Sequence, residues 1–84
     1  MPWDALAVCV DVITIGAVKH CEEPGEEPLA LSEQTIPQHF DACMRHLHSH
    51  RVGIHRDHET GAPHLAHAAV RCLFMLARHL RGLP

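Results

Sequence analysis

Residues 63–81 read PHLAHAAVRCLFMLARHLR, and this stretch decides the fold that the sequence predicts. Apolar side chains recur in it at the three- and four-residue intervals of an α-helix: Leu65, Ala69, Cys72, Leu73, Leu76 and Leu80. Val70, Phe74 and Ala77 widen the apolar surface beyond one stripe. Since two further short helices would not cover all of it, we expect a second copy of the chain to complete the helical bundle as a homo-oligomer.

A second helix is predicted over 36–51. Thr35 offers a capping hydroxyl, Pro37 falls within the first turn, and Gln38 stands at the third helical position, as in a capping box. Gly53 follows at the place where a left-handed residue commonly ends a helix. The apolar stripe of this helix comprises Ile36, Phe40, Cys43 and Leu47.

The N-terminal stretch fits two patterns. Val8, Val10 and Val12 alternate as in a strand, whereas the apolar residues Leu6, Val10, Ile13 and Ala17 follow helical spacing. Strands usually hold about five or six residues. The length of the stretch therefore favours a helix over 4–19.

The whole chain, 1–84, is expected to form one all-α domain, a small bundle of three main helices. Residues 20–34 would connect the first two helices through an acidic segment, in which two prolines and a glycine prevent regular hydrogen bonding. Residues 53–62 would form the junction loop before the last helix.

Composition narrows the class of protein. The four cysteines form no CxxC pair and the N-terminus shows no cleavable signal sequence, which favours reduced thiols in the cytoplasm. The longest uncharged apolar stretch, 12–18, is too short to span a membrane.

The two halves of the chain carry opposite charges. Residues 1–44 carry one lysine against eight acids, a net charge of −7, and residues 45–84 carry six arginines against two acids, a net charge of +4. The halves can pair with each other or with a second copy, and general nucleic-acid binding is not expected.

The run DHETGAPHLAHA, residues 57–68, brings acids and imidazoles to a predicted loop-to-helix junction. His64 and His67 stand three residues apart and share one helical face. If the last two helices pack antiparallel, His50 of the one and His64 of the other lie near the same end, with Asp57 close by. Such a cluster would present imidazole and carboxylate ligands to a divalent metal ion.

Two kinds of ion and one structural alternative follow from this cluster. A site dominated by carboxylates would hold Mg²⁺ or Mn²⁺, whereas His64, His67 and an acid would prefer Zn²⁺ or Ni²⁺. Alternatively, the two histidines hydrogen-bond to the backbone or to Asp57 and hold the loop in place. Glu59 and Thr60 would then be residues of the helix start.

Several short motifs together resemble the phage-encoded dATP/dGTP diphosphohydrolase N-terminal domain family, relatives of the MazG-like all-α nucleotide pyrophosphohydrolases. The motifs are Pro2-Trp3-Asp4-Ala5-Leu6, Gly16-Ala17 with Lys19-His20, Met44-Arg45-His46-Leu47, Gly53, Asp57, Glu59-Thr60-Gly61 and His64-Leu65-Ala66-His67-Ala68. The acid, the Thr-Gly turn and HLAHA in fixed register are the most specific part.

The resemblance implies an oligomeric α-helical protein that removes pyrophosphate from a purine deoxynucleoside triphosphate with Mg²⁺ or Mn²⁺. In this hypothesis the catalytic residues are Asp57, Glu59, His64 and His67. The expected metal ligands are Asp57, Glu59, His64, Glu23 and Glu26. The expected substrate-binding residues are Lys19, Arg45, His46 and Arg71, which would position phosphate or offset its charge.

The sequence also departs from the family pattern. Ile54 stands where relatives often carry an acid, and the ExxE pair Glu23 and Glu26 is interrupted by a proline and a glycine. A second hypothesis is therefore a catalytically inactive relative that binds a host or phage protein, such as a small phage inhibitor of host defence. Its acidic loop, 22–27, would suit a basic partner surface.

Overall fold

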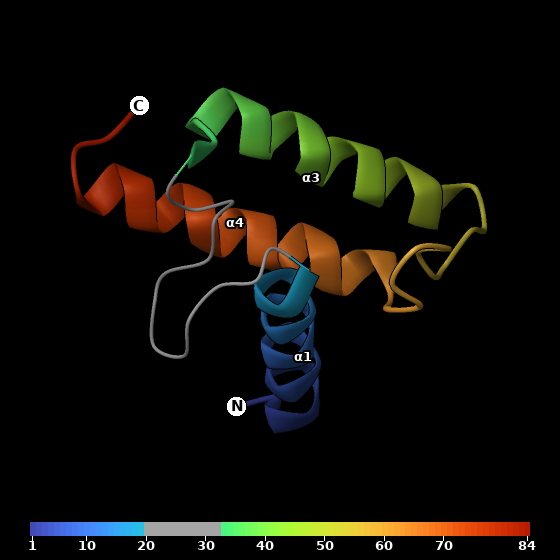
Figure 1. The fold of residues 1–84 in the computed structure, drawn as a ribbon. Helices are drawn as coiled ribbons and strands as arrows, with labels where there is room; N and C mark the ends of the chain where they lie inside the picture. The colour runs from blue at the N-terminus through green and yellow to red at the C-terminus, as the bar shows by residue number, and fades with distance from the viewer. Residues whose placement is uncertain (20–32) are drawn as a thin grey trace.

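The structure is a computed structural model that describes residues 1–19 and 33–84. It contains the helices α1 (Trp3–Lys19), α3 (Ile36–Arg51) and α4 (His64–Leu80), and no strand in the described ranges, which confirms the predicted all-α bundle of three helices. In Figure 1, α3 and α4 lie side by side in opposite directions, and α1 crosses α4 at a steep angle. None of the helices in these ranges has the length and apolar character needed to cross a membrane.

The contact between α1 and α4 forms the apolar core. Val12 of α1 is buried against Ala66, Val70 and Phe74 of α4. Partly buried apolar residues surround this cluster: Val8, Cys9, Ile13, Ala62 and Ala77. The two possible patterns of the N-terminal stretch are thus resolved in favour of a helix, because helical spacing places Val8, Val12 and their neighbours on one face.

The ends of α3 follow the signals in the sequence. The Thr35 hydroxyl accepts the Gln38 N–H at 3.4 Å, and the Gln38 side chain accepts the Thr35 N–H at 2.8 Å, so the predicted capping box is present. At the other end Gly53 has a φ of +96°. The Ile54 N–H donates to the Ser49 carbonyl at 2.9 Å, which closes the last turn and directs the chain into the junction loop.

Small side chains let α3 and α4 approach closely. Ala42 and Cys43 of α3 and Ala68 of α4 are all buried. The Cys43 Sγ lies 3.6 Å from the Ala68 carbonyl oxygen and 3.8 Å from the Sγ of Cys72, and both thiols are free. Burial and the contact with Cys72 raise the pKa of the Cys43 thiol.

The leucine stripe that defines α4 in the sequence is exposed in the single chain. Its large members, Leu65, Leu73, Leu76 and Leu80, have exposed fractions between 46% and 75%. The apolar residues that α4 buries are Ala66, Ala68, Val70 and Phe74. Apart from Phe74 they are smaller than leucine, and small side chains permit the close approach of neighbouring helices. On α3 the apolar side chains of Phe40, Met44 and Leu47 are also exposed.

Candidate functional site

Asp57 organises the junction loop between α3 and α4. One oxygen of its carboxylate, Oδ1, accepts the backbone N–H groups of Glu59 and Thr60, each at 2.9 Å. Its own backbone N–H donates to the Ala62 carbonyl at 2.9 Å, and its carbonyl accepts the N–H of Gly61 at 2.7 Å. Gly61 has a φ of +73°, a conformation that favours glycine. The carboxylate is therefore held in place by bonds within a single tight loop.

His46 of α3 meets His64 at the first position of α4. Their Nδ1 atoms lie 2.8 Å apart, and their ring centroids lie 5.1 Å apart. Two ring nitrogens at this distance share one proton, so one ring donates from Nδ1 and the other accepts. His64 is only 7% exposed, and its backbone N–H donates to the His55 carbonyl at 2.8 Å. The pair thus joins the C-terminal half of α3 to the start of α4.

His67, one turn further along α4, completes the cluster. Its ring stacks on that of His46, with centroids 4.6 Å apart and an interplanar angle of 10°. Its Nε2 lies 2.7 Å from the Thr60 hydroxyl, which contacts Asp57 Oδ1 at 3.4 Å. Both contacts are satisfied when His67 donates from Nε2 and Thr60 donates to Asp57. A hydrogen-bonded path therefore connects an imidazole to the carboxylate through one hydroxyl.

Burial, hydrogen bonds and neighbouring charges lower the pKa values of three groups in this cluster. Burial, together with the positive charge that His67 and His64 can carry, lowers the pKa of His46 to about 4. Burial also lowers the pKa of His67, against the opposing effect of Asp57. For Asp57, burial alone would raise the pKa, but the N–H groups of Thr60 and Glu59 and the nearby imidazoles outweigh it, and the net shift is downward. At neutral pH the cluster therefore holds a neutral His46 beside an ionised carboxylate.

Arg71 lies on the same side of α4, one turn beyond His67. Its Nη1 donates to the side-chain oxygen of Gln34 and to Nδ1 of His39, the latter at 3.0 Å. His39 is fully buried and makes an edge-on contact with Phe74, with centroids 5.4 Å apart. Burial, followed by the positive charge of Arg45, lowers the pKa of Arg71. Among the described residues, both hydrogen bonds of the Arg71 side chain use Nη1.

Three side chains from three segments could hold a metal ion. Possible ligand atoms of His46, Asp57 and His64 all lie within 4.8 Å of one another. Two imidazole nitrogens and one carboxylate oxygen are donors that divalent transition ions accept. The cluster therefore fits a divalent ion, with α3, the junction loop and the first residue of α4 each supplying one ligand.

The predicted site residues fall into three groups. His46, Asp57, His64 and His67 lie together, with Arg71 on the same side of α4. Glu59 and Arg45 are exposed; the backbone of Glu59 supports Asp57, but its side chain is not a member of the ligand group found in the described ranges. Lys19 ends α1 and its side chain lies outside the description, as do Glu23 and Glu26.

Two features of the site were not evident from the sequence. The histidine of α3 that reaches His64 is His46, whereas His50 makes a tilted ring contact with His55, with centroids 4.6 Å apart. Thr60, interpreted as a residue of the helix start, instead links His67 to Asp57. Its position three residues after Asp57, in a loop with glycine next, was a usable signal for such an Asp-centred turn.

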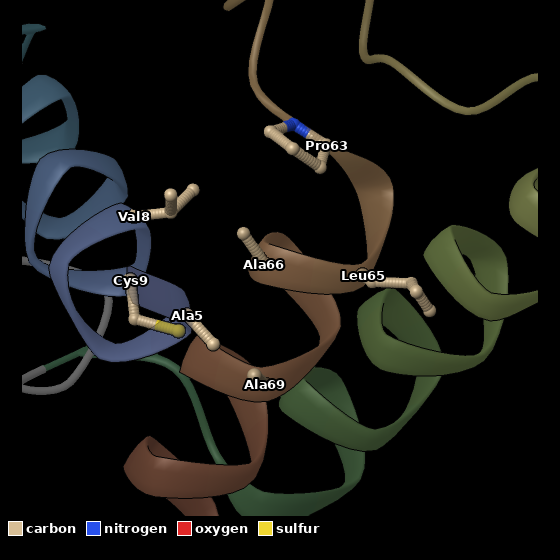
Figure 2. A pocket seen from close by; sticks show the side chains of 7 residues that line it. All are labelled: Ala5, Val8, Cys9, Pro63, Leu65, Ala66 and Ala69. Carbon is tan, nitrogen blue, oxygen red and sulfur yellow. The ribbon is translucent and has the colours of Figure 1, made fainter. Parts of the chain in front are cut away.

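An apolar hollow of about 240 Å³ lies between α1 and α4. Figure 2 shows Val8 and Ala66 directed toward it, with Pro63 at its rim. The remaining lining residues are Ala5, Cys9, Leu65 and Ala69. Because the lining offers no charged side chain, this hollow carries none of the chemistry described above.

Comparison with known proteins identifies the lineage of this chain. The family model described as dATP/dGTP diphosphohydrolase, N-terminal, matches residues 1–83. The chain therefore belongs to the dATP/dGTP diphosphohydrolase N-terminal family, as the sequence motifs predicted. No curated protein and no solved structure matched the chain.

Proposed function

From this family membership, we propose that the chain is a metal-dependent diphosphohydrolase that acts on a purine deoxynucleoside triphosphate. Water would attack a phosphorus atom of the triphosphate, with pyrophosphate leaving and the deoxynucleoside monophosphate remaining. One observation carries the proposal: possible ligand atoms of His46, Asp57 and His64 lie within 4.8 Å of one another, at a junction that the family model covers. A divalent ion held there would polarise a phosphoryl oxygen and acidify a bound water.

The remaining residues of the cluster suit the binding of a triphosphate. Arg71 and the exposed Arg45 would offset the negative charge of the phosphates. Guanidinium groups also bind phosphate oxygens through parallel hydrogen bonds. His67 and Thr60 would fix the orientation of the Asp57 carboxylate. The family resemblance implies Mg²⁺ or Mn²⁺, whereas the imidazoles favour Zn²⁺ or Ni²⁺.

Self-association belongs to the same proposal. The exposed stripes of α3 and α4 place large apolar side chains in water in the single chain, including Phe40, Leu73 and Leu76. Several large exposed apolar side chains on neighbouring helices favour an interface between proteins. A second copy of the chain would cover them, and a mass measurement in solution should report a dimer or a larger oligomer. A monomer at high protein concentration would contradict this part of the proposal.

Release of pyrophosphate from the four deoxynucleoside triphosphates tests the activity directly. We expect pyrophosphate release from dATP or dGTP in the presence of a divalent ion. The rate of release should fall by about 100-fold or more in Asp57→Ala and His64→Ala, because removal of one group that stabilises charge in the transition state commonly has an effect of this size. His48→Ala is the matched control, because His48 is an exposed histidine of α3. Absence of release with Mg²⁺, Mn²⁺, Zn²⁺ and Ni²⁺ would sink the enzyme proposal and favour a binding protein.

A further inference from the structure

The junction cluster combines two imidazoles with one carboxylate, and this donor set is selective among divalent ions. Mg²⁺ binds chiefly through oxygen ligands and retains several waters, whereas Zn²⁺ and ions of similar character bind imidazole nitrogen readily. Catalytic zinc sites commonly have three protein ligands and leave a fourth position open. The donor atoms of the cluster therefore favour an ion of the zinc type over Mg²⁺.

The geometry needs little change to accept such an ion. With metal–ligand bonds of about 2.0–2.1 Å in a tetrahedral arrangement, ligand atoms lie roughly 3.3 Å apart. The Nδ1 atoms of His46 and His64 are 2.8 Å apart in the structure, so a small opening of the pair would admit an ion. The proton they share would move to an Nε2 atom, which leaves both Nδ1 lone pairs available.

The surrounding contacts hold the ligands in place before an ion arrives. Asp57 uses Oδ1 for its hydrogen bonds to the loop, and no hydrogen bond within the described ranges uses its other carboxylate oxygen, Oδ2. The ring of His46 is fixed by stacking on His67, and His64 is nearly buried at the start of α4. Ligands fixed in this manner lose little conformational freedom on binding.

We propose that Nδ1 of His46, Nδ1 of His64 and Oδ2 of Asp57 form a three-ligand site for a zinc-class divalent transition ion, with one position left open. This inference deepens the proposed function and rests on it for the role of the ion, because it names the ligands and the ion of the same site. Ion binding itself is measured without any nucleotide.

Zinc binding by the full chain provides the test. Chelator-treated protein is titrated with Zn²⁺ against a chromophoric competitor, and with Co²⁺, whose visible absorption distinguishes a four-coordinate from a six-coordinate site. We expect one ion per chain and a four-coordinate Co²⁺ spectrum. The affinity for Zn²⁺ should fall by about 100-fold or more in His46→Gln, His64→Gln and Asp57→Asn. Altering a residue that contacts only a ligand, and not the ion, usually costs ~10- to 100-fold, so the loss of a ligand should cost at least as much.

The pair His50 and His55 supplies the matched control, because it is a second place where two imidazoles lie together, with centroids 4.6 Å apart. The double variant His50→Gln, His55→Gln should keep the wild-type affinity for Zn²⁺. Circular dichroism of every variant shows whether it remains folded, and Asp57→Asn retains the oxygen that accepts the loop N–H groups. Loss of binding in the double variant, or wild-type affinity in a folded His46→Gln, overturns the proposed ligand set.

The two proposals fail in different ways. If the three named residues bind Zn²⁺ but no pyrophosphate is released, the enzyme proposal is wrong and the proposed ion site is supported. If the chain binds no Zn²⁺, and hydrolysis with Mg²⁺ persists in His46→Gln, the proposed ion site is wrong and the enzyme proposal is supported.

Discussion

Helix α4 packs against its two neighbours in different ways. Toward α1 it presents Ala66, Val70 and Phe74, and the contact is apolar but leaves a hollow of about 240 Å³. Toward α3 and the junction loop it presents the buried Ala68 beside Cys43, and also three polar side chains, His64, His67 and Arg71, which pair with polar groups. Hydrogen bonds formed on folding largely replace hydrogen bonds to water, so the polar part of the second contact contributes less to stability for its area than apolar packing does. One face of α4 thus forms the apolar core, and the other holds the candidate site.

The largest effect is expected from breaking the apolar contact. Val70→Ala removes two methyl groups from a side chain that is 4% exposed, and should lower the free energy of unfolding by about 2 kcal/mol. Val52→Ala, at a side chain that is 57% exposed and lies outside the leucine stripe, is the matched control and should change it by roughly 0.5 kcal/mol or less. Urea denaturation of both variants measures the difference. Equal losses would mean that α1 and α4 do not form the main core.

A smaller effect is expected from titrating the polar contact. The pKa of His46 is about 4 in the folded chain against 6.5 for an ordinary histidine, so the unfolded chain binds more protons between these values. The melting temperature of chelator-treated protein should therefore be highest above pH 6.5 and fall as the pH decreases toward 4. His67 adds to this decrease, and Asp57 adds to it only below its ordinary pKa near 3.8.

The variant His46→Gln isolates the residue responsible. It removes the titrating group that faces His64, His67, Asp57 and the charge of Arg71, and should flatten the dependence of melting temperature on pH. His48→Gln, an exposed position on the same helix, should leave the wild-type dependence unchanged. An unchanged dependence in His46→Gln would show that the cluster does not bury this ring.

The smallest effect is expected from filling the hollow. Ala69 lines it from α4 and is exposed, so Ala69→Leu can extend into the apolar space without displacing a buried neighbour. We expect a gain of about 0.5–1 kcal/mol in the free energy of unfolding, in the range that cavity filling commonly gives. Thermal unfolding at neutral pH measures it. A clear loss of stability would indicate that the space between α1 and α4 is already closed.

Much of the helical architecture was predictable because its signals are local. The capping box at Thr35 and Gln38, the glycine after α3 and the spacing within α4 each involve residues a few positions apart. Which apolar face of α4 becomes buried was not predictable from periodicity, because Leu76 and Val70 both follow helical spacing. The choice depends on how closely two other helices can approach, and the smaller side chains allow the closer approach.

The candidate site was predictable only in part for a similar reason. The run from Asp57 to His67 lies within one loop and one turn of helix, so its residues were expected together. Which histidine of α3 reaches them depends on the register of α3 against α4, and helical spacing alone does not distinguish His46 from His50, one turn away. The structure selects His46.

Nuclear magnetic resonance of the histidine ring nitrogens tests the central claim most directly, namely that His46 and His64 share one cluster with Asp57. In chelator-treated protein labelled with ¹⁵N, we predict that the His46 ring stays neutral down to a pKa of about 4. At one equivalent of Zn²⁺, the Nδ1 signals of His46 and His64 should shift together while those of His50 and His55 remain in place. A His46 ring that titrates near 6.5, with no joint response to Zn²⁺, would contradict the account.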